Sequence, residues 1–69
     1  MASARDKMIA FIRAQSTELL IATIKKMNRN TTQAAIFCCS MVSKELEMRM
    51  SESDFSELMQ WCESDLMAA

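Results

Sequence analysis

The chain has 69 residues, of which 51% are hydrophobic and 25% are charged, and it contains no glycine and no proline. This length allows one domain, the hydrophobic share argues against a disordered chain, and the lack of glycine argues against a sheet of tight hairpins. The net charge of −1 hides an asymmetry: residues 1–33 hold six Lys or Arg against two Asp or Glu, and residues 34–69 hold two against seven. We expect the two halves to attract each other, within the fold or across a dimer; the alternative is a basic face for an anionic partner.

Good helix formers dominate the composition, so we predict an all-α fold, a small bundle of three to four helices with no sheet. The spacing of apolar residues predicts helices over residues 4–14, 17–28, 31–49 and 52–67 of a single domain, 1–69. Three helices remain the alternative, with the first two segments forming one bent helix.

Polar residues mark the first two breaks between these segments. Ser16 is a typical N-terminal cap, and Asn28 is a residue that tolerates the left-handed conformation in which many helices end. The third helix is expected to be capped by Asn30 or Thr31, because Asn30 and Gln33 have the spacing of a capping box.

The third break is the clearest, and it centres on Ser51. With Ser51 as the N-terminal cap of the last helix, Met50 and Phe55 have the spacing of a hydrophobic staple. Such a staple fixes the angle at which the last helix leaves the third.

The third helix differs from the others because it carries two apolar stripes. One consists of Ala35, Cys38, Cys39, Val42 and Leu46, and the other of Ala34, Phe37, Met41 and Met48. At 100° per residue the two stripes diverge, so this helix needs cover on two sides.

The three cysteines, Cys38, Cys39 and Cys62, are interpreted as structural thiols. The chain has no histidine, a zinc site needs about four ligands, and a nucleophilic cysteine needs a base. There is also no glycine-rich phosphate loop. We therefore expect no catalytic residues, no metal, no cofactor and no small-molecule ligand, and a protein that is not an enzyme.

The second stripe of the third helix predicts a partner interface. Phe37, Met41 and Met48 would form a costly apolar patch if left exposed, and Trp61 flanks the stripe of the last helix, where it could anchor a partner. Pairing of two copies about a twofold axis is the commonest way to cover such a patch. We expect a homodimer, with a different protein partner as the alternative.

A nucleic-acid face is the competing interpretation of the basic half, with Lys7, Phe11 and Gln15 on one helical face. The stretch "FIRAQSTELL" resembles the start of the first helix in Rop-type plasmid copy-number proteins, helical-hairpin dimers that bind RNA loop pairs. The resemblance covers about ten residues and implies RNA contact by Phe11 and Gln15; a helix start at "STEL" and a further helix after Met50 depart from that pattern. The basic residues that would complete this face are Arg13, Lys25, Lys26 and Arg29.

These features favour a small protein–protein interaction module, an adaptor, chaperone or inhibitor that acts through an apolar helical surface. A dimeric RNA- or DNA-binding regulator is the second reading, and a purely structural homo-oligomeric module is the third. By analogy, such proteins are frequent products of plasmids and phages. No stretch approaches the roughly 18 apolar residues that span a membrane, and the apolar run 8–12 is too short for a signal peptide, so we expect a cytoplasmic protein without membrane contact.

Overall fold

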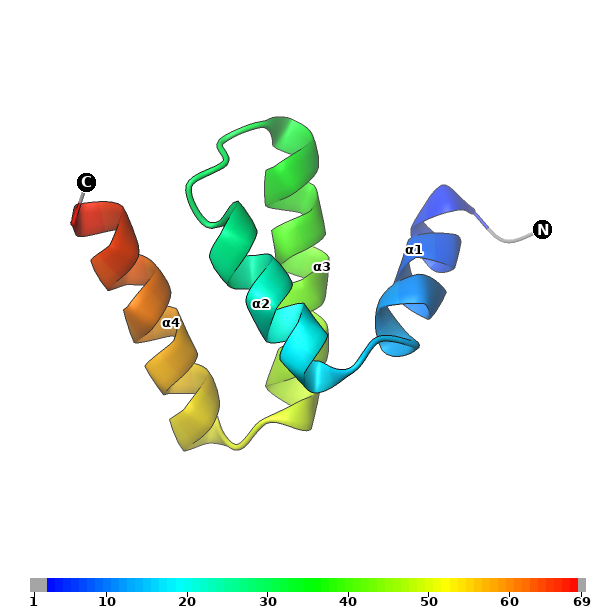
Figure 1. Ribbon diagram of the computed structural model, residues 1–69. Coiled ribbons are helices and arrows are strands. Elements are labelled where there is room, and N and C mark those ends of the chain that lie inside the picture. The colour runs from blue at the N-terminus through cyan, green and yellow to red at the C-terminus, as the bar shows by residue number, and fades with distance from the viewer. Residues whose placement is uncertain (1–2, 69) are drawn as a thin grey trace.

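The computed structural model describes residues 3–68, which form four α-helices and no strand (Figure 1). The helices are α1 (Ala4–Arg13), α2 (Thr17–Met27), α3 (Gln33–Arg49) and α4 (Glu52–Met67). The prediction of a small all-α bundle is confirmed. Residues 14–16 are not helical, so α1 and α2 are separate helices. The three-helix alternative is therefore wrong for the described part of the chain.

A hydroxyl group caps the N-terminus of every helix. In each case the side-chain oxygen accepts a hydrogen bond from the backbone N–H three residues later, which satisfies one of the donors that a helix start leaves free. The capping residues are Ser3, Ser16, Thr32 and Ser51. The caps at Ser16 and Ser51 were predicted from the sequence.

The predicted cap of the third helix was wrong, because Thr32 takes that position instead of Asn30 or Thr31. The Asn30 carboxamide oxygen instead accepts the N–H of Thr32 at 3.0 Å, which forms a local turn just ahead of the helix. Asn28 is also not left-handed: its φ is −58°. No residue in 3–68 has a positive φ, so none of these helices ends in a left-handed cap.

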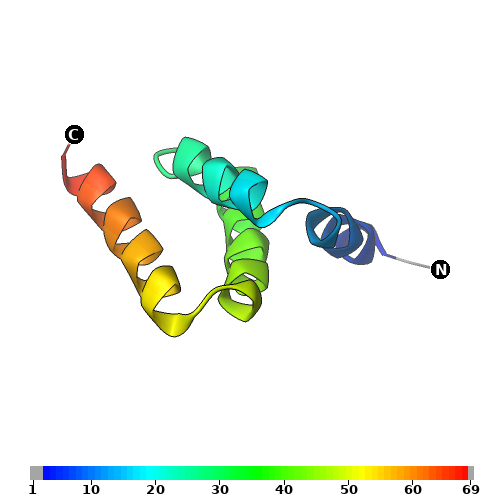
Figure 2. The ribbon, with the colours of Figure 1, turned by 60° about the horizontal axis from the view of Figure 1, so that its bottom comes forward.

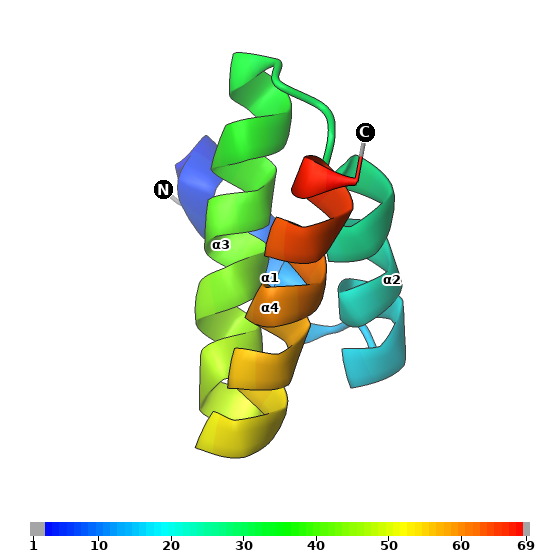
Figure 3. The same ribbon diagram turned by 90° about the vertical axis from the view of Figure 1, so that its left-hand side faces the viewer.

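The α2–α3 hairpin lies in the middle of the molecule, with α1 and α4 on opposite sides of it (Figures 1 and 2). Seen from the α4 side, α4 lies across the seam between α2 and α3 (Figure 3). α3 contacts each of the other helices. Residues from all four helices meet in one core: Ile12, Leu20, Ile24, Val42, Leu46, Leu58 and Cys62.

The turn between α3 and α4 is shaped by its apolar flanks. Met50 and Phe55 are half-buried and both pack against the core, and the Ser51 hydroxyl between them accepts the N–H of Asp54 at 3.1 Å. Met50 has extended backbone and its N–H donates to the carbonyl of Leu46 at 2.8 Å. Burial of the two flanking side chains therefore stops α3 and starts α4 at a fixed angle.

Arginines from elsewhere in the chain take the place of glycine caps at two helix C-termini. Arg49 of α3 donates to the carbonyl oxygen of Arg13, at the end of α1, and to that of Gln15, at 2.9 and 2.7 Å. Arg29, just after α2, donates to the carbonyl of Asp65 near the end of α4 at 2.8 Å. The carbonyls of Arg13 and Asp65 belong to the last turns of their helices, where a helix leaves its carbonyls without an internal partner, and a cation there also complements the helix dipole.

No helix in residues 3–68 is both long enough and apolar enough to cross a membrane.

Replacing Arg49 with alanine should release α1 from the hairpin. The change removes donors to two carbonyls and to Glu45, and we expect a loss of about 1–3 kcal/mol in the free energy of unfolding. Amide hydrogen exchange should quicken most in α1. Arg5→Ala, at an exposed position of α1, should lower the free energy of unfolding by less than about 0.5 kcal/mol. Equal losses of stability for Arg49→Ala and Arg5→Ala would contradict the capping role of Arg49.

Candidate functional site

The cysteines lie at the packed surfaces of α3 and α4. Cys62 is buried, Cys38 and Cys39 are half-buried, and all three are free thiols. Burial, and then the neighbouring Cys38, raise the pKa of the Cys39 thiol; burial, and then Asp65, raise the pKa of the Cys62 thiol. Both thiols are therefore held in the neutral form, which is the less nucleophilic one. No group of three metal-ligating side chains gathers within residues 3–68.

Three of the six basic residues in the first half of the chain contact the second half inside the fold. Arg29 forms an ion pair with Asp65 at 3.1 Å, and Arg13 lies 3.8 Å from Glu45. Lys25 places its Nζ 4.7 Å from the centre of the Trp61 ring, a cation–π contact between α2 and α4. Three of the cations assigned to a nucleic-acid face are thus engaged within the molecule: Lys25 and Arg29 contact α4, and Arg13 contacts α3.

The four residues predicted to form a partner interface do not form one patch. Phe37 and Met48 are exposed, at 49% and 71%, and their spacing of three helical turns puts them on the same side of α3. Met41 is half-buried and packs against the core. Trp61 lies on α4 beneath Lys25.

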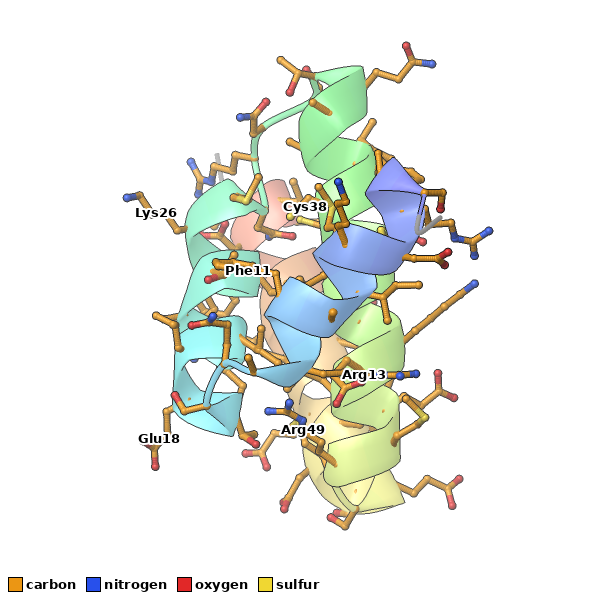
Figure 4. All side chains as sticks on the ribbon, turned by 90° about the vertical axis from the view of Figure 1, so that its right-hand side faces the viewer. Phe11, Arg13, Glu18, Lys26, Cys38 and Arg49 are labelled. Carbon is orange, nitrogen blue, oxygen red and sulfur yellow. The ribbon has the colours of Figure 1, made fainter. Side chains whose placement is uncertain are left out.

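An apolar groove, not singled out from the sequence, lies between α1 and α2 with α3 as its floor. Its volume is about 340 Å³. Its two lips carry large exposed side chains: Met8 and Phe11 from α1 are 38% and 66% exposed, and Leu19 from α2 is 49% exposed. Figure 4 shows Phe11 directed from α1 toward α2. The floor and walls are completed by Ile12, Leu20, Cys38 and Val42.

The two polar side chains of the groove, Gln15 and Thr23, use their donors locally. The Gln15 amide donates to the carbonyl of Phe11 at 3.3 Å, and the Thr23 hydroxyl donates to that of Leu19 at 2.8 Å. Among the residues that the structure describes, none that lines the groove is charged. The groove therefore offers apolar contact rather than a set of hydrogen-bond donors, and a ligand would bind there by burying apolar surface.

A signal for this groove was present in the sequence. Leu19, Leu20 and Ile21 are three consecutive apolar residues in a helix, so they cannot all face one side. Leu20 is buried in the core, and Leu19 lies 100° away on the lip of the groove. What the sequence could not show is the position of α1, because the contacts that fix α1 join residues more than 30 positions apart.

A larger hollow, of about 770 Å³, lies along the outer side of α4. Only α4 residues line it: Glu52, Ser53, Ser56, Glu57 and Gln60. Because one face of a single helix cannot enclose a ligand, this hollow is a solvated acidic surface. Unlike the groove between α1 and α2, it is not a candidate binding site.

Phe11 and Gln15, to which the Rop-type resemblance assigns RNA contact, both line the groove. They do not share one helix, because α1 ends at Arg13 and α2 begins at Thr17. The resembling stretch thus spans a turn. Comparison of the chain with models of protein families, with curated proteins and with solved structures finds no match.

Asp65 should make the docking of α4 sensitive to acid. Hydrogen bonds from Arg29 and Asn28 hold the pKa of this carboxyl below its ordinary value of 3.8. A lowered pKa in the folded state stabilises the protein above pH 3.8, and this contribution is lost as the pH falls further, through the folded-state pKa. Asp65→Asn should therefore be less stable than the wild type at neutral pH, and the gap should close below pH 3.8.

Urea unfolding across that pH range measures the effect. Glu63→Gln is the matched control on the same helix, because Glu63 is exposed and has no ion pair within the described residues. A gap between wild type and Asp65→Asn that does not change with pH would show that the carboxylate charge is not what matters.

Self-association through α3 stays a prediction. The structure indicates which residues of α3 should be substituted to test it. Because Met41 packs against the core, the surface is best probed at Phe37 and Met48. The double variant Phe37→Glu with Met48→Lys should keep the helical content of the wild type and sediment as a monomer, whereas the wild type should sediment as a dimer at micromolar concentration. A monomeric wild type would refute the homodimer.

Proposed function

We propose that this protein is a small protein–protein interaction module, of the adaptor, chaperone or inhibitor class, which binds an apolar helical segment of another protein in the groove between α1 and α2. The observation that carries the proposal is the groove itself. It presents Phe11, Leu19 and Met8 to solvent on its lips, and its polar side chains already donate to neighbouring carbonyls.

The energetics favour an occupied groove. Burying one Phe, Leu or Met side chain stabilises a complex by roughly 1.5–3 kcal/mol relative to leaving it exposed. Three such side chains border one hollow here, and a contiguous exposed apolar patch on a soluble protein commonly marks an interaction site. Part of this gain is offset by the loss of translational and rotational freedom on association, so we expect moderate affinity.

The groove also has the form that a helix requires. Two short helices make its walls and a third makes its floor, so an added helix would pack against ridges of side chains on three sides. Binding of an amphipathic helix in an apolar groove is a recurrent mode of recognition. The free thiols fit a reducing compartment such as the cytoplasm, which we propose as the place of action.

A nucleic-acid-binding regulator is the weaker candidate. Of the basic residues assigned to that face, Arg13, Lys25 and Arg29 contact groups of the protein itself. Lys7 and Lys26 are left, and two phosphate contacts contribute little affinity at physiological salt. A purely structural homo-oligomer is the third candidate, and sedimentation of the Phe37 and Met48 variant addresses it.

Selection from a displayed library of helical peptides tests the proposal. Peptides that bind the wild type should carry apolar residues at i, i+3 or i+4, and i+7. They should lose at least about tenfold in affinity for Phe11→Glu with Leu19→Glu, because two apolar contacts are removed. Ile36→Glu is the control, because Ile36 is 59% exposed and lies outside the groove.

Circular dichroism should show that both variants keep the wild-type helical content, since the altered side chains are exposed. A selection that yields no binder would contradict the proposal. So would binders that tolerate the groove variant, or that respond equally to Ile36→Glu.

A further inference from the structure

We infer that the helix which this groove takes is acidic: an amphipathic segment of about ten residues with Asp or Glu beside its apolar anchors. The inference rests on the proposed function and names the chemistry of the partner. The charged side chains around the groove support it.

Two lysines lie on the walls of the groove close to residues that line it, and neither has a partner in the described part of the chain; the Lys26 side chain points away from α1 (Figure 4). Lys7 precedes Phe11 by four residues, one turn along the same face of α1, and Lys26 follows Leu19 by seven, two turns along the same face of α2. Both are exposed, and neither side chain forms an ion pair or a hydrogen bond within residues 3–68. Free positive charge therefore lies next to the lips of the groove.

No carboxylate in residues 3–68 balances these lysines at the groove. Asp6, the acidic residue of α1, accepts the N–H of Ser3 at 3.3 Å in the capping box of that helix. Glu18, the acidic residue of α2, lies at the opposite end of that helix from Lys26 (Figure 4). Glu45 already pairs with Arg13 and Arg49. The positive charge beside the groove is not compensated within the described residues, and a bound partner with negative charge would compensate it.

The walls set the form and length of the partner. The backbone carbonyls of Phe11 and Leu19 already accept side-chain hydrogen bonds, and no strand edge exists within residues 3–68, so an extended peptide would find no backbone to pair with. α1 has 10 residues and α2 has 11, which corresponds to a wall about 15 Å long. A helix of about ten residues spans that length and presents apolar anchors on one face.

The lysines should act on selectivity more than on affinity. An exposed ion pair contributes little to the free energy of binding. Two such pairs should therefore make the protein bind a peptide with acidic flanks about 3- to 30-fold more tightly than one with basic flanks. That preference should shrink as the salt concentration rises. Salt hardly affects the contacts of the apolar anchors, so the peptide with basic flanks should still bind, although weakly.

Three versions of one helical peptide test the inference. A peptide obtained by selection on the wild type keeps its apolar anchors and receives flanking Glu, Gln or Lys, and fluorescence anisotropy measures its binding. For the wild type we expect the order Glu, Gln, Lys from tightest to weakest. The variant Lys7→Glu with Lys26→Glu should reverse this order. Lys44→Glu, the same substitution at one exposed residue of α3 on the other side of α1, should keep it.

The outcomes separate the inference from the proposed function. Equal binding of all three peptides, with loss in Phe11→Glu and Leu19→Glu, would overturn the acidic partner and leave the groove as a protein-binding site. Failure of every peptide to bind would overturn both. A single-stranded RNA that binds the wild type more tightly than the Glu peptide, and is lost in Lys7→Glu with Lys26→Glu, would overturn both in favour of nucleic-acid binding.

Discussion

The arrangement of the four helices depends on how a chain without glycine ends its helices. Residues 3–68 contain no left-handed residue, so the free carbonyls at the ends of α1 and α4 are satisfied by Arg49 and Arg29 from elsewhere in the chain. Each arginine thereby joins a peripheral helix to the α2–α3 hairpin. A local requirement, the capping of a helix end, becomes the tertiary contact that places α1 and α4.

These contacts also decide which charges remain for a partner. Arg49 and Arg13 share Glu45, and Arg29 and Asn28 share Asp65. Two cations of the basic first half, Arg13 and Arg29, thus pair with two carboxylates of the acidic second half within the fold. The free lysines that remain beside the groove are few, which favours a contact that is mainly apolar and has its orientation set by charge.

The sequence was sufficient to predict the helices and part of their boundaries, because periodicity and capping are local. Ser16 and Ser51 cap helices as expected, and the apolar flanks of Ser51 pack on the core. It was not sufficient at Asn28, which bonds to the carbonyl of Cys62 on α4 at 2.7 Å instead of ending α2 in a left-handed turn. The groove was missed for the same reason, since contacts across the chain position its α1 wall.

The most direct test of the account is an NMR measurement of contacts between the protein and a selected acidic helical peptide. Isotope-filtered spectra should show intermolecular Overhauser effects from the apolar anchors of the peptide to Phe11, Leu19 and Val42, which line the groove. Effects confined to Trp61 and the outer face of α4, or to Phe37 and Met48, would contradict it. Either result would place the binding surface of this protein on another side of the bundle.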